Sequence, residues 1–379
     1  MTVTSRPHSK HCRAVISPMS WKQFLNPLTW YTGRAYRRAP WIVSWPPGPP
    51  TRPLACKWGN DEGNCLGIRT VFPFVTDQPE CWPALPLGSW KDTYATLHMW
   101  TQIVGKVRLG LTPLVNHWWN VPLYVAARGL TTSRIPYGER SFEIWFDFIR
   151  HQLVLETSEG VLKTLPLVPR SVADFYQEFM RMLRSAEIEV KIWHMPVEIP
   201  NPIAFDEDRQ HASYDPQSVE KFWRILLTVD SVFNQYRAGF VGKSSPVHFF
   251  WGSFDLAVTR FSGRRAPERP GADAITQEAY SHEVSSVGFW PGSGDIKDAA
   301  FYSYAAPEPQ GFKEARVRPA AAVYRKELGE FLLMYEDVRT AKSPSKSLLD
   351  FCQSTYVAAA SLGDWDRNGL ERPRIDLAS

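Results

Sequence analysis

The sequence contains no continuous apolar run near the length of about 18 residues that a membrane-spanning helix needs. Its basic start is not followed by an apolar stretch, so the pattern of a secretory signal peptide is absent. Cysteine is scarce, and no two of the five cysteines have the CxxC spacing of a zinc site. Four of them (Cys12, Cys56, Cys65, Cys81) precede residue 84, which leaves Cys352 alone in the remainder. Such a region cannot be a disulfide scaffold, so we predict a cytoplasmic protein without membrane association.

Acidic residues are missing from the first 60 positions, which hold nine of the 43 Lys and Arg residues. The remaining 34 basic and 39 acidic residues leave residues 61–379 with a balance of −5. Affinity for nucleic acid comes from dense positive charge, so this mildly acidic body is not expected to bind it.

The first 83 residues differ in character from the rest. They are rich in Trp, Arg and Pro, include the run PPGPP at 46–50, and show no sustained apolar period. We therefore predict that residues 1–83 are a disordered extension or lie upstream of the true start. Residues 84–372 are predicted to form one globular domain, followed by a tail at 373–379.

Capping signals and apolar periods in residues 84–372 predict an α+β fold with mainly antiparallel sheets. Ser89 with Asp92 and Ser171 with Asp174 have the spacing of capping boxes, and Asp215-Pro216 has the pattern of a helix start. A last helix is expected from Ser343-Pro344 to just before Gly363. Alternating or apolar runs predict strands at 121–127, 142–149, 152–156, 247–261, 279–287, 301–305 and 331–338.

Two segments share a faint similarity that suggests an internal repeat. Val104-Gly105-Lys106 follows the first predicted helix, and Val241-Gly242-Lys243 follows the long one. In each case the Gly-Lys pair is interpreted as a helix C-cap, with the cation near the negative end of the helix dipole; anion binding by Lys106 and Lys243 is the alternative. The two predicted halves, 84–200 and 215–372, would each have a helix–strands–helix order.

The stretch SPVHFFWGSFDLAVTRFSGR at 245–264 resembles a family of mostly bacterial proteins of unknown function. Other stretches fit the same family, including NHWWNVPLYVAARGLTT at 116–132 and YSHEVSSVGFWPG at 280–292. The resemblance extends over about 85–372 and implies a soluble bacterial-type protein. The resemblance brings no information on an activity, a cofactor or catalytic residues.

His248, Asp255, Arg260 and Arg264 lie on or just beyond one predicted strand. On an unbroken strand His248 and Arg260 would share a face with apolar residues, which is costly for a charge that is not paired. We therefore expect either a bulge at Gly252 or an acidic partner for Arg260, such as Asp147 or Glu283. A buried ion pair between strands and a ligand site both fit this pattern.

His282 and Glu283 open another predicted strand, on which adjacent residues point to opposite faces. His248 and His282 with Glu283 or Asp255 have the residue types of a three-ligand metal site, although their spacing is not diagnostic. In the first half, His117 and Arg128 stand in places similar to those of His248 and Arg260 in the second half. Trp290 suits the wall of an apolar pocket.

Three hypotheses follow from these residues. In the first, an aromatic-walled pocket binds a small anionic molecule: Arg260 and Arg264 hold the anion, His117, Arg128 and Trp290 contribute contacts, and His248 and His282 supply acid–base chemistry with Asp255 and Glu283. The second is a metal-dependent hydrolase that uses His248, His282 and Glu283 or Asp255. In the third, a non-catalytic interaction protein uses these side chains as structural pairs. The cofactor and the oligomeric state are not indicated.

Overall fold

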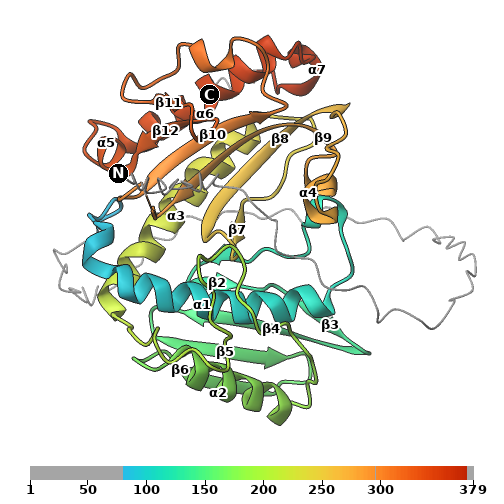
Figure 1. The fold of residues 1–379 in the computed structure, drawn as a ribbon, viewed down its shortest axis with the longest axis vertical. Helices are drawn as coiled ribbons and strands as arrows, with labels where there is room; N and C mark the ends of the chain where they lie inside the picture. Colours follow the sequence, from blue (N-terminus) through green and yellow to red (C-terminus); the bar gives the residue numbers. More distant parts are fainter. Residues whose placement is uncertain (1–79, 295, 374–379) are drawn as a thin grey trace, which may run out of the picture. The chain divides into compact units, whose positions relative to one another are not determined.

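The computed structural model describes residues 80–294 and 296–373, which form two antiparallel sheets with associated helices (Figure 1). The predicted α+β class is confirmed. The predicted extension lies outside the described residues apart from 80–83, where Trp82 packs on Tyr335. The α-helices are α1 (Leu87–Leu111), α2 (Val172–Ser185), α3 (Pro216–Ala238), α4 (Ala274–Ala279), α5 (Tyr335–Arg339), α6 (Pro344–Leu362) and α7 (Arg367–Leu370), and the 3₁₀ turns are η1 (Asn116–Trp118) and η2 (Phe312–Glu314).

The first sheet has the strand order β1-β2-β4-β5-β6, with β3 also paired to β4. Phe142, Ile144 and Phe146 alternate with more polar residues along β4 and are buried, which gives this sheet its apolar face. Its strands are β1 (Tyr124–Ala126), β2 (Gly129–Thr131), β3 (Ile135–Tyr137), β4 (Arg140–Asp147), β5 (Gln152–Thr157) and β6 (Leu162–Pro166).

The second sheet has the order β11-β12-β10-β9-β8-β7 and packs one face on α3 and α6. Both sheets therefore follow a helix–strands–helix order along the chain, but their strand orders differ, so the predicted internal repeat is not confirmed. The strands are β7 (His248–Phe250), β8 (Asp255–Arg265), β9 (His282–Trp290), β10 (Ala300–Ala306), β11 (Val323–Arg325) and β12 (Glu330–Met334).

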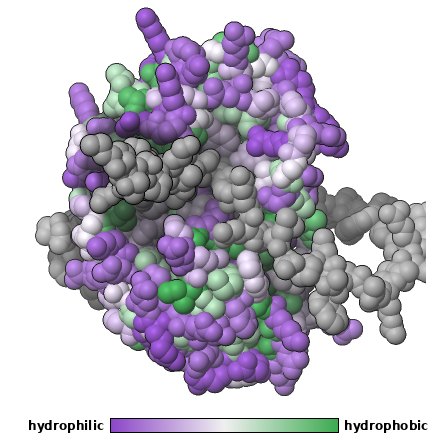
Figure 2. Space-filling model, in the orientation of Figure 1, coloured by the Kyte–Doolittle hydropathy of each residue, from purple (hydrophilic) through white to green (hydrophobic). Residues whose placement is uncertain are grey.

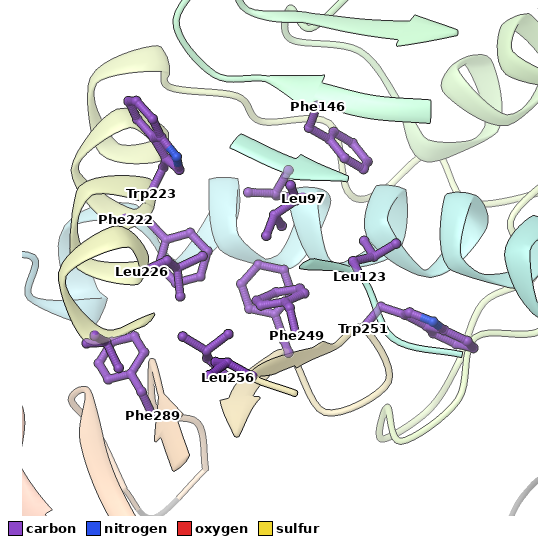
Figure 3. Packing of buried hydrophobic residues seen from close by; sticks show 14 of the residues in the cluster. Leu97, Leu123, Phe146, Phe222, Trp223, Leu226, Phe249, Trp251, Leu256 and Phe289 are labelled. Atoms are coloured by element: carbon purple, nitrogen blue, oxygen red, sulfur yellow. The ribbon is translucent and has the colours of Figure 1, made fainter. Parts of the chain in front are cut away.

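Large apolar side chains of α1, α3 and both sheets form one continuous core (Figure 3). Phe222 of α3 stacks on Phe254 with ring centroids 5.2 Å apart, and Phe249 lies edge-on to Phe254. Hydrophilic side chains dominate the described surface that is visible in Figure 2. Among the described helices, none has the length and apolar character to cross a membrane.

The capping predictions succeeded at two helices and failed at one. The Ser171 side chain accepts from the Asp174 backbone N–H (3.1 Å), and Asp215 accepts from Gln217 and Ser218 at the start of α3. Ser89 does not cap α1, because the helix already begins at Leu87 and the Ser89 hydroxyl donates to the Pro86 carbonyl (2.7 Å).

The interpretation of both Gly-Lys pairs as helix C-caps was wrong. Gly105 and Lys106 lie inside α1 and not at its end. The glycine is needed for packing, because it lets the Trp251 indole approach the helix backbone; a Cβ at position 105 would lie 2.3 Å from Trp251 Cδ1. At α3 the cap is Gly239, which places Gly242 and Lys243 in the connection to β7.

The single strand predicted over 247–261 is divided into β7 and β8 by a turn at Trp251–Phe254, as expected from Gly252. Gly252 lies against the Glu198 carboxyl group, and Phe254 has a positive φ of 60°. On its other side β7 is bonded to the segment before β1: Phe249 and Leu123 exchange two backbone hydrogen bonds of 2.9 Å. The two sheets are therefore joined at this point.

Candidate functional site

The break between β7 and β8 decides which residues share a face of the second sheet. Leu256, Val258 and Arg260 point toward α3 and α6, whereas Asp255, Ala257 and Phe261 point to the opposite side, which we call the outer face. His248 pairs with Ala257 across the ladder and therefore also lies on the outer face. Half-exposed rings of Trp119, Tyr124, Phe250, Tyr280, Trp290 and Tyr304 accompany them.

One end of the outer face carries a group of basic side chains, His117, Lys243, His248 and His282, around Trp119; we call these the basic cluster. His117 Nδ1 lies 3.0 Å from the Glu278 carbonyl, and its Nε2 lies 2.6 Å from Lys243 Nζ. Since the ammonium can only donate, Nε2 is the acceptor and Nδ1 carries the proton. Helix α4, which supplies Glu278, packs against η1 (Figure 1).

Trp119 lies next to three members of the basic cluster. Lys243 Nζ lies 5.3 Å from its ring centroid, and the rings of His117 and His248 lie 5.5 and 6.0 Å away. The His282 ring lies 5.5 Å from that of His117. The backbone at His117 and Trp118 is left-handed, with φ of 57° and 60°, a conformation rare in non-glycine residues.

Electrostatics in the basic cluster disfavour additional positive charge. Burial, and then Lys243, lower the pKa of His117; burial, Lys243 and Arg265 lower the pKa of His282. Burial also lowers the pKa of Lys243, and it lowers that of His248 to about 3. Among the described residues no carboxylate forms an ion pair with Lys243, whose ammonium group contacts His117 Nε2 and the rings of Trp119 and Phe261. The Glu278 carboxylate at this cluster accepts a hydrogen bond from the His117 backbone N–H (3.2 Å).

The other end of the outer face holds the carboxyl group of Asp255. It accepts hydrogen bonds from the hydroxyl groups of Ser253 and Tyr302. Tyr302 reaches Asp255 by lying across Gly288 of the intervening strand β9, where a Cβ would come within 2.2 Å of Tyr302 Cζ. Burial raises the pKa of Asp255 to about 6 despite the two hydrogen bonds.

Two further carboxyl groups, Glu198 and Glu330, lie near Asp255, and we call the three the acidic cluster. Burial, and then Asp255, raise the pKa of each glutamate to about 8. Glu198 has a positive φ of 58°, and its Oε1 is buried without a hydrogen-bond partner. Three separate segments of the chain thus bring acids to the same end of the outer face.

Arg260, predicted to hold an anion, lies on the inner face and is only 1% exposed. Its guanidinium carbon lies 3.5 Å from the Tyr236 ring centroid and 4.3 Å from that of Tyr356, and Nη2 donates to the Tyr236 carbonyl. Of the two alternatives predicted for this strand, the break near Gly252 is observed, and the acidic partner for Arg260 is not: Asp147 pairs with Arg128 and Glu283 with Arg264. Arg260 instead binds the carbonyl end of α3, where the helix dipole favours a cation.

Arg264 is also engaged with a helix end. Its Nε and Nη2 donate to Glu283 (2.9 and 2.7 Å), and Nη1 donates to the Asp364 carbonyl beyond α6 (2.9 Å). Since His282 faces the basic cluster while Glu283 faces Arg264, the two adjacent residues point to opposite sides as expected.

The remaining predicted site residues are separated. Arg128 belongs to the first sheet, where its Nε lies 3.4 Å from buried Asp147, and Trp290 lies toward the acidic cluster with Tyr302. His248, His282 and Glu283 do not form a metal-ligand set: within the described residues no three His, Cys, Asp or Glu side chains have an arrangement that could hold a metal ion.

Several residues of the two clusters were not singled out from the sequence. Lys243 was interpreted first as a helix-capping cation, with anion binding as the alternative, while Glu198 stands in a proline-rich connection and Glu330 at a strand start, where nothing local marks them. Tyr302 carries a recognisable signal only in combination with Gly288, since a small residue on the neighbouring strand permits the cross-strand approach.

Comparison with known proteins gives a family but no activity. A family model described as a family of unknown function, DUF5996, matches residues 82–372. No curated protein and no solved structure is detectably similar to the chain. Because the match covers well over half of the sequence and contains both clusters, the chain belongs to this family of unknown function.

Proposed function

We propose that the outer face of the second sheet binds a small anionic molecule at the basic cluster. The observation that carries this proposal is the convergence of Lys243 with His117, His248 and His282 around the half-exposed ring of Trp119, where no carboxylate of the described residues pairs with the lysine. An ammonium group and imidazole N–H groups are donors that suit carboxylate or phosphate oxygens.

His248 supports the same proposal. It is 1% exposed, and within the described residues neither of its ring nitrogens has a hydrogen-bond partner. A neutral imidazole carries one donor and one acceptor, and leaving a buried polar group unsatisfied costs about 1–3 kcal/mol. A ligand oxygen beside the His248 N–H would remove part of this cost.

The rings around the cluster suit the body of the ligand. Trp119 stands between two histidines, and Tyr280 and Tyr304, whose hydroxyl groups lie 3.1 Å apart, continue the aromatic surface along the sheet. For turnover at this cluster we assign the acid–base role to His282. Its ring is partly exposed, whereas burial keeps the His248 ring neutral by lowering its pKa to about 3.

The test is a calorimetric and thermal-shift screen of the full chain against carboxylates, dicarboxylates, phosphate and phosphorylated small molecules. We expect at least one compound to bind, with an affinity that falls at least about tenfold in Lys243→Met. Lys326→Met, at an exposed position on another edge of the same sheet, is the matched control and should leave binding unchanged. Binding that is equally weakened in both variants, or no binding by any anion, would overturn the proposal.

A further inference from the structure

The basic and acidic clusters lie along one face of β8, within reach of one elongated molecule. Asp255 is two residues before Ala257, and Ala257 is paired with His248. A strand advances roughly 3.3 Å per residue, so His248 lies about 7 Å along β8 from Asp255, whereas Lys243 and His117, which contact the Phe261 ring, lie about 20 Å along β8 from it. Phe250, on the same face, pairs with Asp255 and lies 5.5 Å from the His248 ring, which makes the surface between the clusters apolar.

The acidic cluster has the groups that bind a cation. Glu198 Oε1 is buried and accepts no hydrogen bond from the described residues. The carboxyl groups are accompanied by the rings of Tyr94, Trp290 and Tyr302. Carboxylates combined with aromatic faces are the groups that recognise ammonium ions. Glu198 belongs to the connection between α2 and α3, whereas Asp255 begins β8, so the fold itself assembles this end.

We propose that the ligand of the outer face is zwitterionic: its anionic group lies at the basic cluster, and its ammonium group lies between Glu198 and Asp255. This inference rests on the proposed function of the basic cluster and adds the charge of the second end of the ligand. It makes the aromatic surface between the clusters a spacer that selects the separation of the two charges.

The inference can be tested with three matched series of linear compounds: simple carboxylates, ω-hydroxy carboxylates and ω-amino carboxylates, of roughly six to sixteen carbons, to cover the separations of both His248 and Lys243 from Asp255 along β8. Affinities for the full chain are measured by calorimetry. The ω-amino compound of the best length should bind at least about tenfold more tightly than the carboxylate and hydroxy analogues.

Isosteric variants identify the residues responsible. Asp255→Asn and Glu198→Gln should each remove most of the advantage of the amino compound, while affinity for the simple carboxylate stays within about twofold of the wild type. The amide oxygen introduced by Asp255→Asn can still accept from the Tyr302 hydroxyl, and the melting temperature of each variant shows whether it is folded. If Asp255→Asn does not fold, Glu198→Gln alone decides the question.

The outcomes separate the two proposals. Carboxylates that bind through Lys243 with no advantage for the amino series would overturn the zwitterion and leave the anion site standing. Equal advantage for the hydroxy series would overturn it also, because charge would then not be recognised. If a simple alkylamine binds through Asp255 while no carboxylate binds, the cation end is supported and the anion site fails.

A proton balance gives an independent readout. Raised pKa values mean that the glutamates of the acidic cluster are mainly protonated near pH 7, so an ammonium group that favours their ionised forms should release protons. A simple carboxylate at the histidines should instead take protons up. Binding enthalpies in buffers of different ionisation enthalpy measure the sign; net uptake by the amino compound beyond that of the carboxylate would contradict the inference. The titratable groups that affect Asp255 are Glu198, Glu330, Tyr94, Tyr280, Tyr302 and Tyr304.

Discussion

Gly288→Ala tests whether the close approach of Tyr302 to β9 builds the acidic end of the site. A Cβ at position 288 would lie 2.2 Å from Tyr302 Cζ and 2.3 Å from its hydroxyl oxygen. The ring is held between strands and is 7% exposed, so it has little room to move aside. We expect the substitution to displace the ring and to break the hydrogen bond that Tyr302 donates to Asp255.

The expected magnitude follows from three contributions. Overpacking a core position costs about 1–3 kcal/mol. Loss of a hydrogen bond to a charged group costs about 1.5–3 kcal/mol. Replacing glycine by alanine in a strand gains about 0.5–1 kcal/mol. The variant should therefore lose about 2–5 kcal/mol of unfolding free energy, measured by urea denaturation.

A double-mutant cycle isolates the contact. In a Tyr302→Ala background the ring is absent, so Gly288→Ala should no longer destabilise the protein and should show only the strand gain of about 0.5–1 kcal/mol. The reasoning would be refuted if Gly288→Ala had the same effect on stability with and without the Tyr302 ring.

Four further outcomes are expected. Gly105→Ala should lower the melting temperature, because its Cβ would meet the buried Trp251 indole, whereas Gly88→Ala in the same helix, with nothing within 4 Å, should not; a rise in both would contradict the packing argument. Burial lowers the pKa of His98 to about 4, so the stability that its neutral form contributes is complete above pH 6.5 and is lost as the pH falls to 4. In urea titrations, the unfolding free energy of His98→Phe should therefore fall between pH 6.5 and pH 4 by on the order of 3 kcal/mol less than that of the wild type. Glu198 behaves oppositely, because burial raises its pKa to about 8: its contribution is lost as the pH rises from 4.5 to 8, and Glu198→Gln should be more stable than the wild type at pH 8 but not at pH 4. Arg264→Met should cost about 1 kcal/mol, measured by chemical denaturation, through loss of the half-exposed Glu283 pair and the bonds at the end of α6; an unchanged midpoint would deny Arg264 this role.

Local signals in the sequence were sufficient for the fold class and for most elements. The alternation through Phe142, Ile144 and Phe146 defined β4, and the Asp215-Pro216 pair defined the start of α3. The same local reasoning failed at Gly105, because the glycine is required by a tertiary contact with Trp251, 146 residues later in the chain, and does not mark a helix end.

The site was less predictable for a related reason. His117, His248 and His282 were identified as candidates, and the structure brings them to one cluster. Arg260 and Arg264 were not separable by residue type from ligand-binding arginines, because a guanidinium suits an anion and the carbonyl end of a helix equally well. Which of the two it meets depends on where α3 and α6 end against the sheet, which no local pattern encodes.

The short strand β7 has a consequence for how the protein meets other molecules. Edge strands with free N–H and C=O groups are templates on which further chains can pair. On its outward side Phe249 of β7 is hydrogen-bonded to Leu123 of the same chain by two backbone bonds. The opposite edge strand β11 has only three residues, of which the last is Arg325, and Lys326 follows it. Among the described residues the second sheet therefore leaves little backbone for another chain to extend, so strand addition at this sheet is a poor route to self-association.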